Sequence, residues 1–447
     1  MIEAGYEMIK LERIENIKKI CEGKPESTGE KLTIRGKRET FNTYRIPLDF
    51  LIYNSRNGRF KSKFMTYLAN HNHELNSENL EDSKIIAEFI WNSSESKNKS
   101  TLEDLRKKGQ QRPGIITNDG RIIDGNRRYM LLSKLFEQDP SNLQFAYFET
   151  IVLPEDIDDK ELVRLETEVQ LGQDEKEGYG AIEKYLKVHE LIDEFGYPQK
   201  TVSDLMKITE QKVNEYVEIY ELFEEYLHHI NRIGQYDLLE QIEDPIIQLR
   251  NAIDKLKRGT HPACLTRSIS ELDIVHLKTI VFDTIRIKPT GDHKIVRTIL
   301  GSPKTKNADG IFGRKEIWKK FRNNHYQKYT EKVETFIKDK EEQLAQISTD
   351  KKQIIEEVEN QVAKKFGSEF QKRITEANRD VSIAVSDDAP MHLIDQINSD
   401  SEKLFNDYYE IITSDYLNDK KFFERIKNIL DKIEMIKRGI EECRLKR

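Results

Sequence analysis

The sequence is poor in cysteine and contains no long apolar run. Its three cysteines, Cys21, Cys264 and Cys443, are far apart and form no CxxC pair, so we expect neither a disulfide framework nor a cysteine zinc site. No stretch approaches the roughly 18 apolar residues of a membrane span, and the chain shows no basic-then-apolar leader. We therefore expect a protein of the reducing cytoplasm, with no membrane contact.

The chain also lacks the positive charge that is typical of nucleic-acid-binding proteins. Its formal net charge is -7, so any contact with DNA would need a local basic patch. Charged residues make up 34% and hydrophobic residues 37%, a balance that favours a helix-rich fold. A length of 447 residues predicts about two to four domains with real cores.

One short stretch, residues 122–128, combines features of an anion site. Two isoleucines run into Asp124 and Gly125, and Arg127 and Arg128 follow at the start of a helical run. A strand that ends at a glycine turn and opens a helix leaves backbone N–H groups free for an anion. The forked donors of arginine also suit phosphate oxygens. The alternative is a charged turn on a solvated surface.

The elements around this turn follow a recognisable order. Residues 102–108 predict a short helix that closes at Gly109, and residues 118–120 (Asn-Asp-Gly) predict a hairpin turn. A strand over 145–152 and a helix over 156–170 complete the order.

The preceding part of the chain is expected to be mostly helical. A helix is expected over 11–20, a strand with a proline over 43–53, and helix over 64–91. Residues 92–100 are polar and are expected to form a linker.

This order resembles the ParB/sulfiredoxin-like fold followed by the helix-turn-helix of ParB-type partition proteins. The resemblance covers residues 102–227. Residues 109–113 match the family's Gly-x-x-x-Pro strand entry, and residues 125–128 match its arginine-rich GERR box, while Asp124 fits a DGQHR-like variant. Residues 46–60 are similar to the family's opening strand with its Asn/Arg box.

The resemblance implies a bound nucleoside triphosphate, CTP or ATP, together with Mg²⁺. The third family box, ENxQR, is matched only in part by residues 166–171, which leaves nucleotide hydrolysis open. Glu166 and Glu168 are the expected metal ligands and candidate catalytic residues, and the alternative for both is a solvated helix face. The residues expected to contact the nucleotide are Arg56, Arg59, Gln111, Arg112, Asp124, Gly125, Asn126, Arg127, Arg128 and Gln170.

A helix-turn-helix is predicted after this domain. Residues 200–206 and 211–227 have helical apolar spacing, and a turn through 208–210 separates them. The expected DNA contacts are Gln211, Lys212 and Asn214. Residues 200–225 hold three lysines against seven acids, so the alternative is a helical bundle that supports the nucleotide domain.

The C-terminal third carries a basic stretch and two heptad patterns. Residues 311–329 mix lysine and arginine with aromatics, which suits either a nucleic-acid contact or a helix with one solvated face. Apolar heptads run over 333–358 and again over 422–440, with a loop expected over 381–390. They predict either an antiparallel hairpin or a dimeric coiled coil, and a homodimer is slightly favoured.

These observations predict an α+β protein with a small mixed-sheet domain, a helix-turn-helix region and a long-helix C-terminal part. The leading hypothesis is a nucleotide-binding, DNA-associated protein in which the triphosphate acts as a switch. The alternatives are an NTP-using enzyme (NTPase, nuclease or kinase-like) of a phage-defence or mobile-element system, and an interaction module whose pocket is vestigial. A partner protein of the same system is a further expectation. The expected segments are a lead-in helix over 1–35, the nucleotide domain over 36–172, the helix-turn-helix over 173–260, a connector over 261–330 and the long helices over 331–447.

Overall fold

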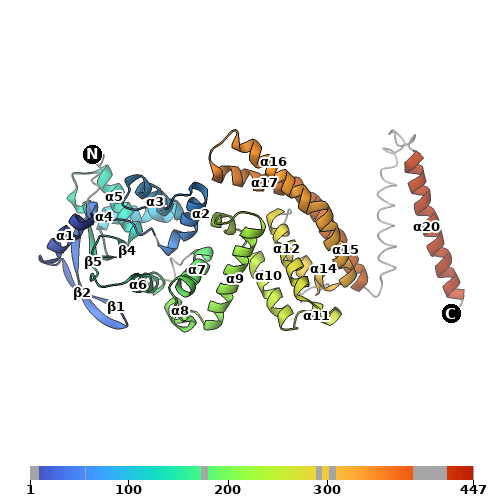
Figure 1. Cartoon of the computed structure of the whole chain (residues 1–447), viewed down its shortest axis with the longest axis horizontal. Helices are drawn as coiled ribbons and strands as arrows, with labels where there is room; N and C mark the ends of the chain where they lie inside the picture. The colour runs from blue at the N-terminus through green and yellow to red at the C-terminus, as the bar shows by residue number, and fades with distance from the viewer. Residues whose placement is uncertain are drawn as a thin grey trace.

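Figure 1 shows the computed structural model of the chain. The structure describes residues 10–55, 57–172, 180–287, 294–301, 309–385 and 420–445. A mixed sheet lies near the N-terminus and helices form the remainder, so the predicted α+β class is confirmed. None of the described helices is long and apolar enough to cross a membrane.

The sheet has five strands in the order β1-β2-β5-β3-β4, and its pairs are antiparallel except for β3 with β5. The strands are β1 (Ser27–Ile34), β2 (Lys37–Pro47), β3 (Gly114–Ile116), β4 (Ile122–Asp124) and β5 (Tyr147–Val152). The hairpin predicted at residues 118–120 joins β3 to β4, and the strand expected over 145–152 is β5. Strand β1 was not predicted, because most of its side chains are exposed and it lacks an apolar pattern.

Helices cover the sheet and carry the residues around the turn at its β4 edge. They are α1 (Lys10–Cys21), η1 (Leu48–Phe50), η2 (Gly58–Phe60), α2 (Lys61–His71), α3 (Leu80–Ser93), α4 (Glu95–Lys108), α5 (Asn126–Gln138), η3 (Leu143–Phe145) and α6 (Asp159–Gly172). Helix α1 confirms the lead-in helix predicted over 11–20. The core beneath these helices includes Ile46, Ile116, Met130, Leu131 and Phe148, each almost fully buried.

The linker predicted over 92–100 is wrong, because most of this stretch is helical. Helix α3 ends at Ser93 and α4 begins at Glu95. The corner between them is held by Asn98, whose buried amide donates to the carbonyl oxygens of Ile90 (3.0 Å) and Trp91 (2.8 Å). This stretch therefore forms helix in spite of its polar composition, and the buried Asn98 stabilises the corner between the two helices.

The middle of the chain is helical, and the predicted helix-turn-helix is present in it. Its elements are α7 (Ala181–His189), η4 (Glu190–Glu194), α8 (Gln199–Met206), α9 (Glu210–His229), η5 (Tyr236–Leu239), α10 (Glu243–Lys257), α11 (Ala263–Thr266), α12 (Glu271–Ile287), α13 (Lys294–Leu300) and α14 (Gly310–Gly313). Helices α8 and α9 form the motif. Lys207 ends α8 in the left-handed conformation, and the Thr209 side chain caps α9 by accepting from the backbone N–H of Lys212.

The C-terminal helices show how the first heptad pattern is paired. They are α15 (Lys315–His325), η6 (Tyr326–Thr330), α16 (Glu331–Ala345), α17 (Lys351–Val385) and α20 (Lys420–Leu445). Helices α16 and α17 fold back on each other within one chain, so the seam over 333–358 forms a hairpin. The loop expected over 381–390 is helical as far as Val385, and its remainder lies outside the described residues. In the basic stretch, Trp318 and Phe321 are buried and the neighbouring Lys319 and Lys320 are exposed, as expected of a helix with one solvated face.

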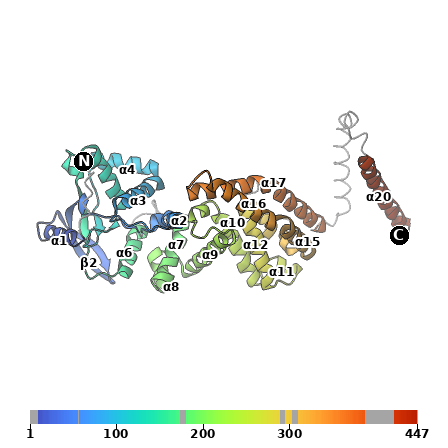
Figure 2. The same cartoon turned by 45° about the horizontal axis from the view of Figure 1, so that its top comes forward.

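Helix α2 ties the sheet domain to the helical part. Near its first turn, Lys61 pairs with Glu190 at 2.9 Å. Near its last turn, the side-chain oxygen of Asn70 accepts from Gln235 at 2.7 Å, and the carbonyl of Ala69 accepts from Lys351 at 2.9 Å. Figure 2 also shows α2 between the sheet domain and the α16–α17 hairpin.

Candidate functional site

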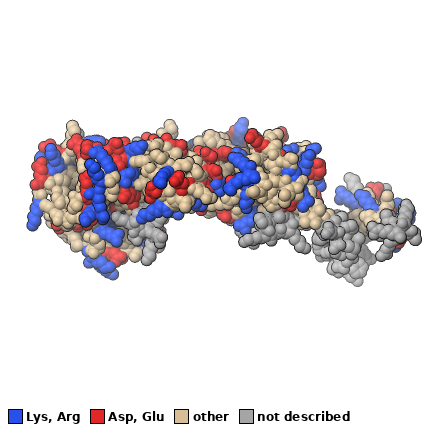
Figure 3. All heavy atoms as spheres, turned by 90° about the horizontal axis from the view of Figure 1, so that it is seen from below, with Lys and Arg blue, Asp and Glu red and all other residues tan. Residues whose placement is uncertain are grey.

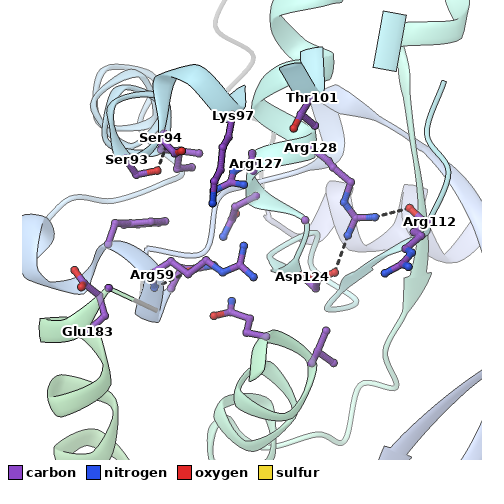
Figure 4. A pocket seen from close by; sticks show the side chains of 18 of the residues that line it. Arg59, Ser93, Ser94, Lys97, Thr101, Arg112, Asp124, Arg127, Arg128 and Glu183 are labelled. Carbon is purple, nitrogen blue, oxygen red and sulfur yellow. Dashed lines mark hydrogen bonds and ion pairs between the residues drawn. The ribbon is translucent and has the colours of Figure 1, made fainter. Parts of the chain in front are cut away.

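A cavity of about 620 Å³ opens beside the turn between β4 and α5. Residues from η2, α2, α3, α4, α5, α6 and α7 line it, so segments far apart in the sequence meet there (Figure 4). Six cationic and four acidic side chains are among the lining residues. The lining includes Asn57, Arg59, Phe60, Lys63, Ile90, Ser93, Ser94, Lys97, Thr101, Asp104, Leu105, Gly109, Gln111, Arg112, Asp124, Gly125, Asn126, Arg127, Arg128, Val169, Gln170, Gly180, Glu183 and Glu240.

Gly125 shapes the turn that opens α5. Its φ of 111° and ψ of 15° place it in a region that side chains rarely adopt, and a Cβ there would lie 2.6 Å from Cζ of Phe148. No side chain caps α5. The first-turn N–H groups of a helix have no intrahelical acceptor, so this uncapped end presents donors and the positive end of the helix dipole to the cavity.

Asn126 places an unused donor in the cavity wall. The residue is only 4% exposed, and its Oδ1 accepts from the backbone N–H of Asn54 at 3.2 Å. Its Nδ2 is buried and has no hydrogen-bond partner in the described part of the chain. A buried unpaired donor is costly, and a ligand oxygen at this point would satisfy it.

Three cationic side chains converge on the same space. Figure 4 shows Arg59, Lys97 and Arg127 pointing toward one another from η2, α4 and α5. The Nε of Arg59 is buried and has no hydrogen-bond partner within the described ranges. The sequence did not identify Lys97, because it falls in the stretch expected to be a linker. The spacing of Ser94, Lys97 and Thr101, which fits one face of a helix, is the signal that could have pointed to it.

Arg128 holds the turn together. Its guanidinium donates to Oδ2 of Asp124 at 2.6 Å, to the carbonyl of Pro113 at 3.0 Å and to the carbonyl of Arg112. It also lies over the ring of Phe148. Arg128 and Asp124 therefore position the strand entry and the glycine turn against each other, while both still line the cavity.

Two other residues expected at the nucleotide lie at the rim. Gln111 and Arg112 line the cavity and are exposed, and the amide of Gln111 donates to the carbonyl of Lys108 at 2.6 Å. Arg56 lies outside the described residues.

Gln170 presents an acceptor to the cavity, and Glu166 fixes its orientation. The Gln170 side chain is 4% exposed, and its Nε2 donates to Oε1 of Glu166 at 3.0 Å. A carboxylate oxygen accepts hydrogen bonds, so the amide nitrogen of Gln170 must face Glu166. The amide oxygen Oε1 is left buried, with no hydrogen-bond partner among the described residues. A ligand hydroxyl or amino group would satisfy it.

Glu166 belongs to a buried charge cluster. Its Oε1 also accepts from the backbone N–H of Gly58 at 3.2 Å, and its Oε2 lies 3.2 Å from Nζ of Lys187. The fully buried Lys187 also contacts Glu190 at 2.6 Å, and Glu190 reaches Lys61 at 2.9 Å. Burial raises the pKa of Glu166 while Lys187 opposes the rise. The pKa of Glu190 is lowered, although burial acts to raise it, because both lysines contact its carboxylate.

The structure does not bring Glu166 and Glu168 together at the cavity. Neither is among the residues that line it, and Glu168 pairs with Arg164 at 2.5 Å on the α6 surface. Within the described ranges, no group of three or more His, Cys, Asp or Glu side chains could hold a metal ion.

The predicted DNA contacts lie at the start of α9. Gln211 and Asn214 are exposed there. Lys212 is half-buried, pairs with Glu215 at 2.8 Å and lies over the ring of Tyr216. Figure 3 shows Lys and Arg interspersed with Asp and Glu over the face of the molecule that it presents.

One solved structure is similar to this chain. It is the C-terminally truncated chromosome-partitioning protein ParB from Caulobacter crescentus, complexed with CTP-gamma-S. The match covers 47% of this chain and 93% of the ParB chain, with 13% identity and a TM-score of 0.16. At this identity and TM-score, no residue role is carried over from it. No family model and no curated protein matches the sequence.

Proposed function

We propose that the cavity binds a nucleoside triphosphate, CTP or ATP, and that the protein is a nucleotide-dependent, DNA-associated switch. The observation that carries the proposal is that the uncapped α5, Arg59 and Arg127 meet in one cavity. The same cavity is lined by Asn126, whose buried Nδ2 has no hydrogen-bond partner among the described residues. Arginines and an open helix N-terminus are the groups that hold phosphate oxygens in proteins.

Two features favour a nucleotide over a small inorganic anion. The volume lies within the range of roughly 300–1,000 Å³ that is usual for small-molecule sites. The unpaired Oε1 of Gln170 needs a donor, which a base or a ribose supplies and a fully ionised phosphate does not. The apolar side chains of Phe60, Ile90 and Val169 add surface against which a base or sugar can pack.

The link to DNA rests on the α8–α9 motif. Its second helix presents Gln211 and Asn214 to solvent, and both side chains can pair with adenine in a major groove. The buried cluster of Glu166 and Lys187 joins α6 of the nucleotide cavity to α7, which is followed by η4 and then α8. A nucleotide at Gln170 would therefore change the surroundings of a charge cluster that leads toward the motif.

Calorimetric titration of the full chain with CTP, ATP and GTP tests the nucleotide proposal. At least one should bind, and Asn126→Asp should lower its affinity by about tenfold or more, because the variant keeps the acceptor for Asn54 but places a negative charge in the cavity. Arg106→Ala is the matched control, since Arg106 is exposed on α4 and outside the cavity lining. If none of the three nucleotides binds, the proposal is wrong.

Retention on a DNA column at increasing salt tests the DNA proposal. Double substitution of Gln211 and Asn214 by Ala should reduce retention without changing nucleotide affinity, because both side chains are exposed and neither lines the cavity. Gln353→Ala, which removes an exposed neutral amide on α17 outside the motif, is the control. Retention that the double variant leaves unchanged would remove α9 from the DNA contact.

A further inference from the structure

The carboxylates expected to hold Mg²⁺ are already bound to other groups. Both oxygens of Glu166 accept hydrogen bonds from Gly58, Gln170 and Lys187, and the side chain is 2% exposed. Glu168 pairs with Arg164 outside the cavity lining. Mg²⁺ requires near-octahedral oxygen ligands, so a carboxylate that is closed in by three donors has no place for it.

Most of the carboxylates that line the cavity are paired with other side chains. Three of the four have a partner: Asp124 with Arg128 (2.6 Å), Asp104 with Lys108 (3.3 Å) and Glu183 with Ser62 (2.6 Å). The fourth, Glu240, is exposed. Glu240 is a single carboxylate, and within the described residues no cluster of acidic side chains is arranged to hold the divalent ion that the family resemblance implies.

The side chain of Lys97 adds positive charge to the cavity. Lys97 lines the cavity from the first turns of α4 and points toward Arg127 and Arg59 (Figure 4). Within the described residues it makes no hydrogen bond or ion pair, in contrast to Lys99 on the same helix, which pairs with Glu95 at 2.6 Å. An ammonium group is a compact point charge on a flexible stem and can follow a phosphate chain.

We propose that side-chain cations alone neutralise the phosphates in this cavity, with Lys97 in the role of a metal ion, so that nucleotide binding does not depend on Mg²⁺. The proposal rests on the proposed nucleotide site. Arg59 and Arg127 supply forked donors, the Nδ2 of Asn126 supplies a buried neutral donor, and Lys97 supplies the mobile charge.

Titration of the full chain with CTP, ATP and GTP, in excess Mg²⁺ and separately in excess EDTA, tests this proposal. The dissociation constant of the nucleotide that binds should differ by no more than about threefold between the two conditions. Binding in Mg²⁺ that disappears in EDTA would overturn the metal-independent site and leave the nucleotide site intact. Absence of binding in both conditions would overturn both.

The Lys97→Ala variant separates the lysine from the remaining cations. In EDTA it should bind the nucleotide about tenfold or more weakly than the wild type, because one of the cations that face the phosphates is lost. Lys99→Ala is the matched control, because Lys99 lies two positions further along the same helix, pairs with Glu95 and does not line the cavity. This variant should bind the nucleotide like the wild type in both conditions. Circular dichroism checks that both variants remain folded, and equal affinities of Lys97→Ala and the wild type in EDTA would overturn the assignment of Lys97.

Discussion

At the scale of single residues, buried charge is concentrated beside the cavity. Lys187 has no exposed surface and lies between the carboxylates of Glu166 and Glu190. These groups take no part in lining the cavity, yet Glu166 also fixes the amide of Gln170 and the backbone of Gly58. The cluster therefore positions two sides of the cavity at once.

Removal of the central cation should be strongly destabilising. Lys187→Met keeps most of the volume but leaves two buried carboxylates without their shared partner, so we expect a loss of about 3–5 kcal/mol in the free energy of unfolding. Urea denaturation followed by circular dichroism measures it. Lys184→Met, on the same helix and partly exposed, should change the free energy by less than about 1 kcal/mol. Equal effects of the two substitutions would contradict the buried cluster.

The residues of this cluster also show which features of the site could not be predicted from the sequence. The turn from Asp124 to Arg128 was predictable, because strand, glycine and helix are adjacent in the chain. The role of Glu166 was not, because its partners Gly58 and Lys187 lie 108 and 21 positions away along the chain. Spacing alone gives no information on which side of α6 faces Lys187.

At the scale of elements, α20 differs from the other long helices. Its apolar residues remain exposed, including Phe423 (51%), Ile429 (55%) and Ile436 (53%). Figures 1 and 2 show it beyond the far end of α17, away from the other described helices. The heptad spacing was visible in the sequence for both C-terminal seams, but only the structure separates the seam that is buried within the chain from the one that is not.

Pairing of α20 between two copies should strengthen as salt is added. The positions that flank its apolar seam carry Lys432 and Lys437, which would face like charges in either a parallel or an antiparallel pair. Salt screens this repulsion and leaves the apolar contact unaffected or stronger. Analytical ultracentrifugation at low and high salt measures the dimer fraction. Ile433→Glu should abolish the dimer, and a dimer that weakens with salt would contradict this pairing.

At the scale of the whole molecule, α2 couples the sheet domain to the helical part. One end of the helix binds Glu190, and the other end meets η5 and α17. The backbone N–H of Asp237 also donates to the hydroxyl of Thr66 at 3.1 Å. Contacts of this kind make it difficult for one part to unfold while the other stays intact.

Differential scanning calorimetry should therefore show one cooperative unfolding transition that includes both the sheet domain and the helical part. Thr66→Val removes a buried acceptor and should lower the free energy of unfolding by about 1–3 kcal/mol, which shifts the transition to lower temperature without splitting it. Thr335→Val, which removes an exposed hydroxyl on α16, is the control. Two separate transitions in the wild type would show that α2 does not couple the parts.

The length of α17 has a consequence for how the size of the protein is measured. Its 35 residues span roughly 52 Å at 1.5 Å per residue, and the sheet domain extends beyond its first turn. A compact protein of this chain length would have a radius of gyration of about 22 Å, and a molecule arranged along such a helix must exceed that value. A monomer will therefore elute early from a size-exclusion column, near the position expected of a compact dimer. Absolute mass from light scattering, and not elution volume, distinguishes one copy from two.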